Sequence, residues 1–128
     1  MTRAQKRTIT LTGRAPVRIA ESAWPQIARA DRTEEDGAIQ RRWHLLVRRH
    51  ADGRILIYGI KLVLGVIGLS NDIHGGELLE PGELTKAEVF GEIPNAILRV
   101  AHTIGLPELA QVCCAQLPAV ELDGEHAS

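Results

Sequence analysis

The stretch RRWHLLVRRHADGRILIYGIKL, residues 41–62, decides the fold of this chain. Its centre is Asp52-Gly53, a dipeptide that favours a tight type I′ turn because both of its positions tolerate a positive φ. The turn divides two runs, 41–50 and 54–62, in which apolar side chains recur with the two-residue period of a strand. The stretch therefore predicts a β-hairpin, and we expect it at the centre of a small antiparallel sheet.

A two-residue loop would also fix the register of this hairpin. The apolar pairs facing each other on one side are then Trp43–Leu62, Leu45–Ile60 and Val47–Tyr58. We expect this side to pack beneath C-terminal helices. Arg42 and Arg48 should then project from the opposite side, toward water.

The N-terminal segment predicts one strand and one short helix. Residues 8–12 alternate polar and apolar side chains, which is typical of a half-buried strand, and 17–19 extend or restart it. Ser22 is a suitable helix cap, and Pro25 then lies in the first turn. The buried side chains of this helix are expected to be Trp24, Ile27 and Ala28. Residues 31–37 are charged, so we expect a polar loop there.

The C-terminal part predicts helices. Thr85 and Glu88 form a capping-box pattern for a short helix that ends at Gly91. Pro94 and Pro107 suit the first turns of two further helices. Their inward side chains are expected to be Ile97, Val100, Ala101 and Ile104 in the first, ended by Gly105, and Leu109, Val112, Cys113 and Leu117 in the second.

This order of elements predicts an α+β fold, a small antiparallel sheet with a central β-hairpin and helices packed on one face. The 128 residues and 45% hydrophobic content suit a single domain, 1–128, with flexible termini at 1–7 and 123–128. No export signal or membrane-spanning run is visible. Cys113 and Cys114 are adjacent and read as reduced thiols, so we expect a cytoplasmic protein without a membrane partner.

The near-neutral charge hides an asymmetry. Residues 1–61 hold thirteen Lys and Arg against six Asp and Glu, whereas residues 62–128 hold two against ten. The two halves could face each other, within one molecule or across a homodimer. The alternative is a basic surface that meets an anionic partner.

Basic residues concentrate in the hairpin itself. The candidate partner-binding or nucleic-acid-binding residues are Arg41, Arg42, Arg48, Arg49, His50 and Arg54. A ribbon rich in arginine can bind phosphates or pair with acidic protein. Because aromatic residues make up only 3% of the chain, stacking on single strands is less favoured than phosphate contact or protein pairing. An exposed face that serves only solubility is the structural alternative.

Few residues suggest chemistry. The sequence contains no P-loop, no dinucleotide-binding glycine motif and no complete nucleophile elbow. Asp72, His74 and Glu77 are a weak metal-ligand candidate, because they offer oxygen and nitrogen ligands within one segment. The glycines of residues 65–82 also fit a long polar loop or an irregular strand without a metal. We therefore expect no catalytic residue and no cofactor.

Parts of the sequence resemble a group of uncharacterised small proteins from bacterial genomic islands, conjugative elements and plasmids. The similar segments are 8–19, Trp24-Pro25, 47–54, Tyr58-Gly59 and 75–79. The resemblance implies a bacterial accessory gene, and products of such genes often regulate the element or inhibit host defences such as restriction or CRISPR. We expect a non-enzymatic protein that binds a protein or nucleoprotein complex. The alternatives are a regulator that binds nucleic acid through the hairpin and, less favoured, a metal-dependent enzyme.

Overall fold

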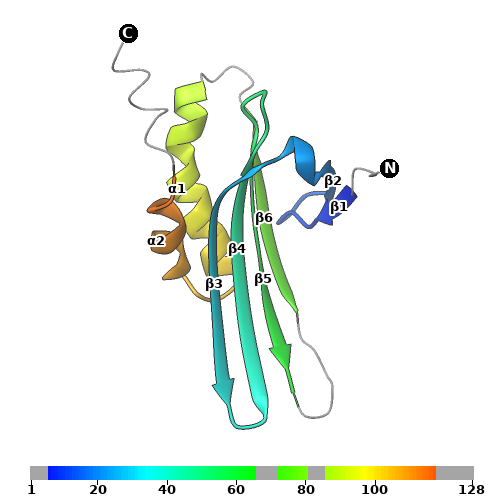
Figure 1. Cartoon of the computed structure of the whole chain (residues 1–128), viewed down its shortest axis with the longest axis vertical. Coiled ribbons are helices and arrows are strands. Elements are labelled where there is room, and N and C mark those ends of the chain that lie inside the picture. The colour runs from blue at the N-terminus through cyan, green and yellow to red at the C-terminus, as the bar shows by residue number, and fades with distance from the viewer. Residues whose placement is uncertain (1–5, 66–71, 81–85, 118–128) are drawn as a thin grey trace.

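A four-stranded antiparallel sheet forms the centre of the molecule (Figure 1). The computed structural model describes residues 6–65, 72–80 and 86–117. The sheet strands lie in chain order: β3 (Gln26–Asp36), β4 (Ile39–Arg49), β5 (Ile55–Leu64) and β6 (Ile73–Leu79). The other elements are β1 (Lys6–Ile9), β2 (Val17–Ala20), the 3-10 helix η1 (Glu21–Ala23), α1 (Lys86–Thr103) and α2 (Leu109–Cys114). The expected α+β class is confirmed.

Both faces of the sheet are covered near the turn that joins β4 to β5. Helices α1 and α2 pack on one face, and the β1–β2 pair covers the other (Figure 1). The core beneath the helices includes Trp43, Leu45 and Val47. The second core joins Leu46 and Leu56 to residues of the β1–β2 layer. Strands β4 and β5 are therefore apolar on both sides, as central strands of a covered sheet are.

The register of the β4–β5 hairpin differs by one residue from the expected one. The His50 amide donates to the Arg54 carbonyl at 2.9 Å, and the Gly53 amide donates to the His50 carbonyl at 2.9 Å. Only Gly53 in this turn has a positive φ, 97°. This is a three-residue loop that ends in a left-handed glycine, not the two-residue type I′ turn that we predicted.

A shift of one residue exchanges the two faces of a strand. Leu46 now pairs with Tyr58, and Val47 pairs with Ile57. The expectation that Tyr58, Ile60 and Leu62 lie under the helices was wrong. Their place beneath the helices is taken by Ile55 and Ile57, whereas Leu45 is fully buried there as expected.

The helix predicted from Ser22 and the polar loop predicted at 31–37 were also wrong. Only the short η1 forms there, and β3 then pairs with β4 along its length. Ala28 and Ala30 are buried in the helix-side core, and α2 packs against this strand. Gly37, with φ 60°, begins the two-residue loop to β4, as a type II′ turn requires. Cross-strand pairing therefore outweighed the local capping signals.

α1 is one continuous helix, although we predicted a break between Gly91 and Pro94. The expected inward residues Ile97, Val100, Ala101 and Ile104 are all buried. In α2, Leu109 and Cys113 are buried, but Val112 is 49% exposed and was wrongly placed inward. Burial of the α1 stripe compensates for the hydrogen bond that Pro94 removes.

The glycine-rich segment contains a regular strand. In β6, a side chain on Gly76 would collide with the carbonyl oxygen of Thr10, and one on Gly75 would lie 2.9 Å from the Thr103 methyl carbon. These two glycines let the N-terminal segment and α1 approach the strand closely. Lys6 and Arg7, expected in a flexible terminus, belong to β1, whereas 1–5 and 123–128 lie outside the described residues. In the described parts of the chain, no helix is long and apolar enough to cross a membrane.

Candidate partner-binding surface

The structure divides the six candidate basic residues of the hairpin into separate groups. Arg41 and Arg42 lie near the start of β4, whereas Arg48 and Arg49 lie at its end. Along an extended strand this separation is on the order of 20 Å. The six residues therefore do not form one continuous patch.

Arg48 is a buried residue, although we expected it to face water. Its side chain lies between the sheet and the β1–β2 layer, and the residue is only 8% exposed. Its Nε donates to the Tyr58 hydroxyl at 2.9 Å, and its Nη1 donates to the Trp24 carbonyl at 3.0 Å. A carboxylate oxygen of Glu21 lies 3.7 Å from Nη2. These contacts give Arg48 a structural role in joining the two layers.

At the β4–β5 turn, basic side chains gather around Asp52. The Arg54 Nε donates to the Asp52 carboxylate at 2.8 Å, and its guanidinium lies 4.9 Å from the Trp24 ring centroid. The His50 Nδ1 lies 3.0 Å from the same carboxylate. The Arg54 main-chain amide, followed by its side chain, holds the pKa of Asp52 below its ordinary value. Asp52 therefore neutralises part of the charge at this turn.

The remaining candidates have polar neighbours. The Arg42 Nε donates to Gln40 at 2.8 Å, and Arg41 lies opposite Glu34 in the ladder. Arg49 is half-buried, and its amide donates to the Pro25 carbonyl at 3.0 Å.

A larger basic surface is formed with residues that the sequence analysis did not single out. We define the basic layer as residues 6–25 and 48–56, which comprise β1, β2, η1 and the β4–β5 turn. It contains seven Lys and Arg, Lys6, Arg7, Arg14, Arg18, Arg48, Arg49 and Arg54, against Glu21 and Asp52. Two features of the sequence could have indicated this surface. One is the excess of Lys and Arg in residues 1–61, and the other is the alternation of Val17, Arg18 and Ile19.

Two arginines of the basic layer are open to a partner. Arg14 and Arg18 are exposed, and neither forms an ion pair within the described residues. Arg18 and Arg54 line one surface hollow together with Trp24. Arg7 differs, because its Nη1 donates to Glu21 at 3.1 Å. The exposed cations therefore continue from β2 to the hairpin turn.

The three weak metal-ligand candidates do not converge. His74 and Glu77 are three residues apart in β6, so their side chains leave opposite faces of the sheet. Both Glu77 oxygens accept hydrogen bonds from Arg99 at 2.7 Å, and this contact raises the pKa of Arg99. Asp72 lies just before the strand and is exposed. Across residues 6–65, 72–80 and 86–117, no group of three potential ligands is close enough to hold a metal ion.

The two cysteines occupy different environments, and Cys113 faces inward as expected. The Cys113 thiol is buried against the Leu45 carbonyl, with the sulfur 3.6 Å from the oxygen, and burial raises its pKa to about 12. Cys114 is half-buried, and burial raises its pKa as well. A thiol with a raised pKa is a poor nucleophile.

Comparisons with models of protein families, with curated proteins and with solved structures found no match for this chain. The arrangement of charge on the described residues is therefore the basis for the functional argument. Its most distinctive part is the basic layer with its exposed Arg14 and Arg18.

Proposed function

We propose that this protein is a non-enzymatic binding protein that places its basic layer against an anionic surface of a protein or nucleoprotein partner. The observation that supports this proposal is the excess of Lys and Arg over carboxylates in that layer, six besides the buried Arg48 against Glu21 and Asp52. Arg14 and Arg18 are exposed at its surface. Such a surface attracts an anionic partner and orients it during association.

In this proposal the protein acts in the bacterial cytoplasm as an inhibitor of a host defence complex, of the CRISPR or restriction type. Inhibition results from occupying the target, without a chemical step. The support for this biological setting is the resemblance of residues 8–19 and 47–54 to proteins of bacterial mobile elements. The basic layer contains much of that similar sequence, including Arg14, Arg18 and Arg54.

Direct binding of nucleic acid is the second candidate function. The observation that favours it is that β1 and β2 form a two-stranded antiparallel ribbon with exposed basic side chains. A ribbon of this kind fits the major groove of a duplex, and arginine side chains bind phosphates.

The test compares two charge reversals of equal size. Arg14→Glu with Arg18→Glu changes the basic layer, whereas Arg41→Glu with Arg42→Glu changes the far end of β4 and is the matched control. We expect the first variant to lose about tenfold or more of its affinity for the host complex that the wild type captures. The control should retain its affinity within about threefold. Equal losses in the two variants, or unchanged binding by the first, would contradict the proposal.

Nuclease treatment distinguishes the two candidate functions. Capture of the complex after nuclease digestion is expected for a protein surface. For nucleic acid, a labelled duplex should bind directly, with a log–log salt slope of about −0.9 per phosphate neutralised. Removal of one contacting arginine, such as Arg18→Ala, should then make the slope shallower by about one.

A further inference from the structure

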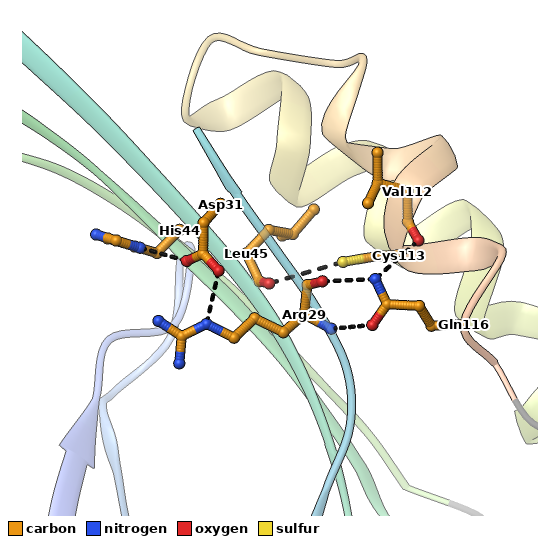
Figure 2. Close-up of polar contacts among 7 residues, drawn as sticks. All are labelled: Arg29, Asp31, His44, Leu45, Val112, Cys113 and Gln116. Atoms are coloured by element: carbon orange, nitrogen blue, oxygen red, sulfur yellow. Dashed lines mark hydrogen bonds and ion pairs between the residues drawn. The ribbon is translucent and has the colours of Figure 1, made fainter. Parts of the chain in front are cut away.

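Strand β3 lies at one edge of the sheet, and a side chain of the C-terminal segment occupies part of its outer edge. The Gln116 side chain contacts both main-chain groups of Arg29 (Figure 2). The Arg29 amide donates to Gln116 Oε1 at 2.9 Å, and Gln116 Nε2 donates to the Arg29 carbonyl at 2.6 Å. This side-chain amide therefore makes the pair of hydrogen bonds that a neighbouring strand would make.

The contact with Gln116 shows which main-chain groups of β3 point away from β4. Outward and inward residues alternate along an edge strand, so Asp31, Thr33 and Glu35 have the same orientation as Arg29. The β3–β4 loop indicates the same orientation. The pair Asp36–Ile39, which closes this two-residue loop, is hydrogen-bonded, so Asp36 points toward β4 and Glu35 points away from it. Within the described residues, the outward main-chain groups at 31, 33 and 35 have no hydrogen-bond partner.

Beyond the ion pair of Arg32 with Glu108, at the start of α2, the β3 edge also extends past the elements that cover the two faces of the sheet. Figure 1 shows the β3–β4 hairpin continuing past α1, α2 and the β1–β2 pair. It is a long edge with open main-chain groups, a geometry that accepts a further strand.

Charge determines which strand can be added. Residues 31–36 contain four carboxylates, Asp31, Glu34, Glu35 and Asp36, and one arginine, Arg32. A second copy of this edge is disfavoured, because residues 31–36 hold one arginine against four carboxylates, a net charge of −3, and two such segments repel each other. Antiparallel pairing about Thr33 would place Asp31 opposite Glu35, although it would also place Arg32 opposite Glu34. Shifting the centre by one residue to Glu34 places two glutamates opposite each other, and only the Arg32–Asp36 pairs of that register are complementary. Like charges at opposing positions destabilise a strand pair, whereas a basic strand is attracted to this edge.

We propose that the outer edge of β3 at residues 31–36 binds an extended, lysine- or arginine-rich segment of a partner protein as an added β-strand. The outward main-chain groups of Asp31, Thr33 and Glu35 supply the hydrogen bonds. Asp31 already pairs with Arg29, and Glu34 pairs with Arg32. Within the described residues Glu35 and Asp36 have no ion-pair partner, and they lie on opposite sides of the strand, with Asp36 on the helix side. Basic side chains of either parity therefore meet a carboxylate. This inference does not depend on the basic layer, which lies at the other end of the sheet.

The probe is a capped peptide of alternating lysine and threonine, long enough to pair with residues 30–36. A glutamate–threonine peptide of equal length is the charge control. Addition of the lysine peptide to the wild-type protein should shift the NMR amide signals of residues 31–36, and the glutamate peptide should leave them in place. Analytical ultracentrifugation of the protein alone should show no self-association through this edge. The wild type and Thr33→Pro should therefore sediment alike.

A proline at position 33 blocks strand addition selectively. The Thr33 amide points outward and is not used in the β3–β4 ladder, so Thr33→Pro removes an edge donor while the fold is retained. The matched control is His74→Pro on β6, the opposite edge of the same sheet, where Gly76 already directs its amide outward to Thr12. Thr33→Pro should weaken binding of the lysine peptide about tenfold or more, and His74→Pro should leave it within about threefold.

A second variant tests the charge without changing the main chain. Glu35→Gln with Asp36→Asn should weaken binding of the lysine peptide severalfold and reduce its salt dependence. The proposal is overturned if the lysine peptide causes no shifts in the wild-type protein. Equal binding of the two peptides, or equal losses in the two proline variants, also overturns it. Association of the protein with itself through Thr33 would assign the edge to a second copy instead.

Discussion

Strand β4 contains an arginine pair near each end, Arg41-Arg42 and Arg48-Arg49, and the two pairs have different surroundings. Arg42 is exposed and contacts another surface side chain, Gln40. Arg48 is buried and donates to Tyr58 and to the Trp24 carbonyl. The same residue type in the same strand thus serves as surface charge at one end and as a link between layers at the other.

The difference arises from the cover on each end of the sheet. The β1–β2 layer and the helices enclose the turn end, whereas the β3–β4 hairpin extends past both (Figure 1). A guanidinium enclosed in this way must be hydrogen-bonded, because a buried charge without partners is very unfavourable. Tyr58 and Trp24 supply acceptors for Arg48.

The largest expected effect contrasts apolar side chains at the two ends of the sheet. Leu45 is fully buried beneath the helices, whereas Leu64, at the uncovered end of β5, is 39% exposed. Leu45→Ala should lower the free energy of unfolding by about 2–5 kcal/mol. Leu64→Ala should change it by less than about 0.5 kcal/mol. Chemical denaturation measures both, and similar losses would mean that the two ends are covered alike.

The second comparison replaces one arginine from each pair. Arg48→Ala should destabilise the protein by about 1–3 kcal/mol, because it leaves the Tyr58 hydroxyl and the Trp24 carbonyl without their donor. Arg42→Ala should stay within about 0.5 kcal/mol of the wild type, as exposed substitutions do. Equal stability of the two variants would show that Arg48 has no structural role.

A smaller loss of stability is expected from a substitution in the β4–β5 turn, next to Arg49. Gly53 has a φ of 97°, a conformation that is strained for any residue with a side chain. Gly53→Ala should therefore cost about 1–2 kcal/mol in unfolding free energy. Asp52→Ala should cause no backbone strain, because Asp52 has a negative φ, as do all non-glycine residues that the structure describes. A loss below about 0.5 kcal/mol for Gly53→Ala would contradict the positive φ at this position.

The smallest effect is a pH dependence at the uncovered end. Partial burial opposes ionisation of Asp31, but hydrogen bonds from Arg29 and His44 outweigh it and lower its pKa (Figure 2). A lowered pKa stabilises the fold above the unfolded-state value near 4, and this contribution is lost as the pH falls through the folded-state value.

Asp31→Asn should therefore be less stable than the wild type at pH 7, by less than about 1 kcal/mol because the group is partly exposed. The difference should disappear near pH 2. Denaturant titrations at the two pH values measure it, with Asp36→Asn as the control. A difference that grows on acidification would contradict the stabilising role of the ionised carboxylate.

Local sequence patterns predicted some of these features and missed others. The apolar alternation in β4 predicted the central hairpin, and the stripe from Ile97 to Ile104 predicted the C-terminal part of α1 and its buried face. The continuation of α1 through Pro94 was not predicted. Ser22 and Pro25 misled because helix-capping signals describe local preference, whereas β3 is stabilised by pairing with β4. Asp52-Gly53 fits two loop lengths, so the register could not be fixed from those two residues alone.

The candidate surface was harder to predict than the fold. Whether Arg48 is exposed depends on residues 17–24, which cover it from a distant part of the sequence. The exposure of Arg14 and Arg18 depends on the same packing of β1 and β2 on the sheet. Charge counts located the basic half of the chain, but only the layered arrangement separates structural arginines from those available to a partner.

The register of the β4–β5 hairpin determines which side of the sheet Arg48 occupies, and one NMR measurement tests it. Because the His50 amide donates to the Arg54 carbonyl, alternation makes Val47 and Ile57 a close, non-hydrogen-bonded pair. A strong nuclear Overhauser effect between the Hα atoms of Val47 and Ile57 is therefore expected. A strong Hα–Hα effect between Arg48 and Ile57 instead would establish the two-residue loop, turn Arg48 away from Tyr58, and contradict the account given for the two arginine pairs.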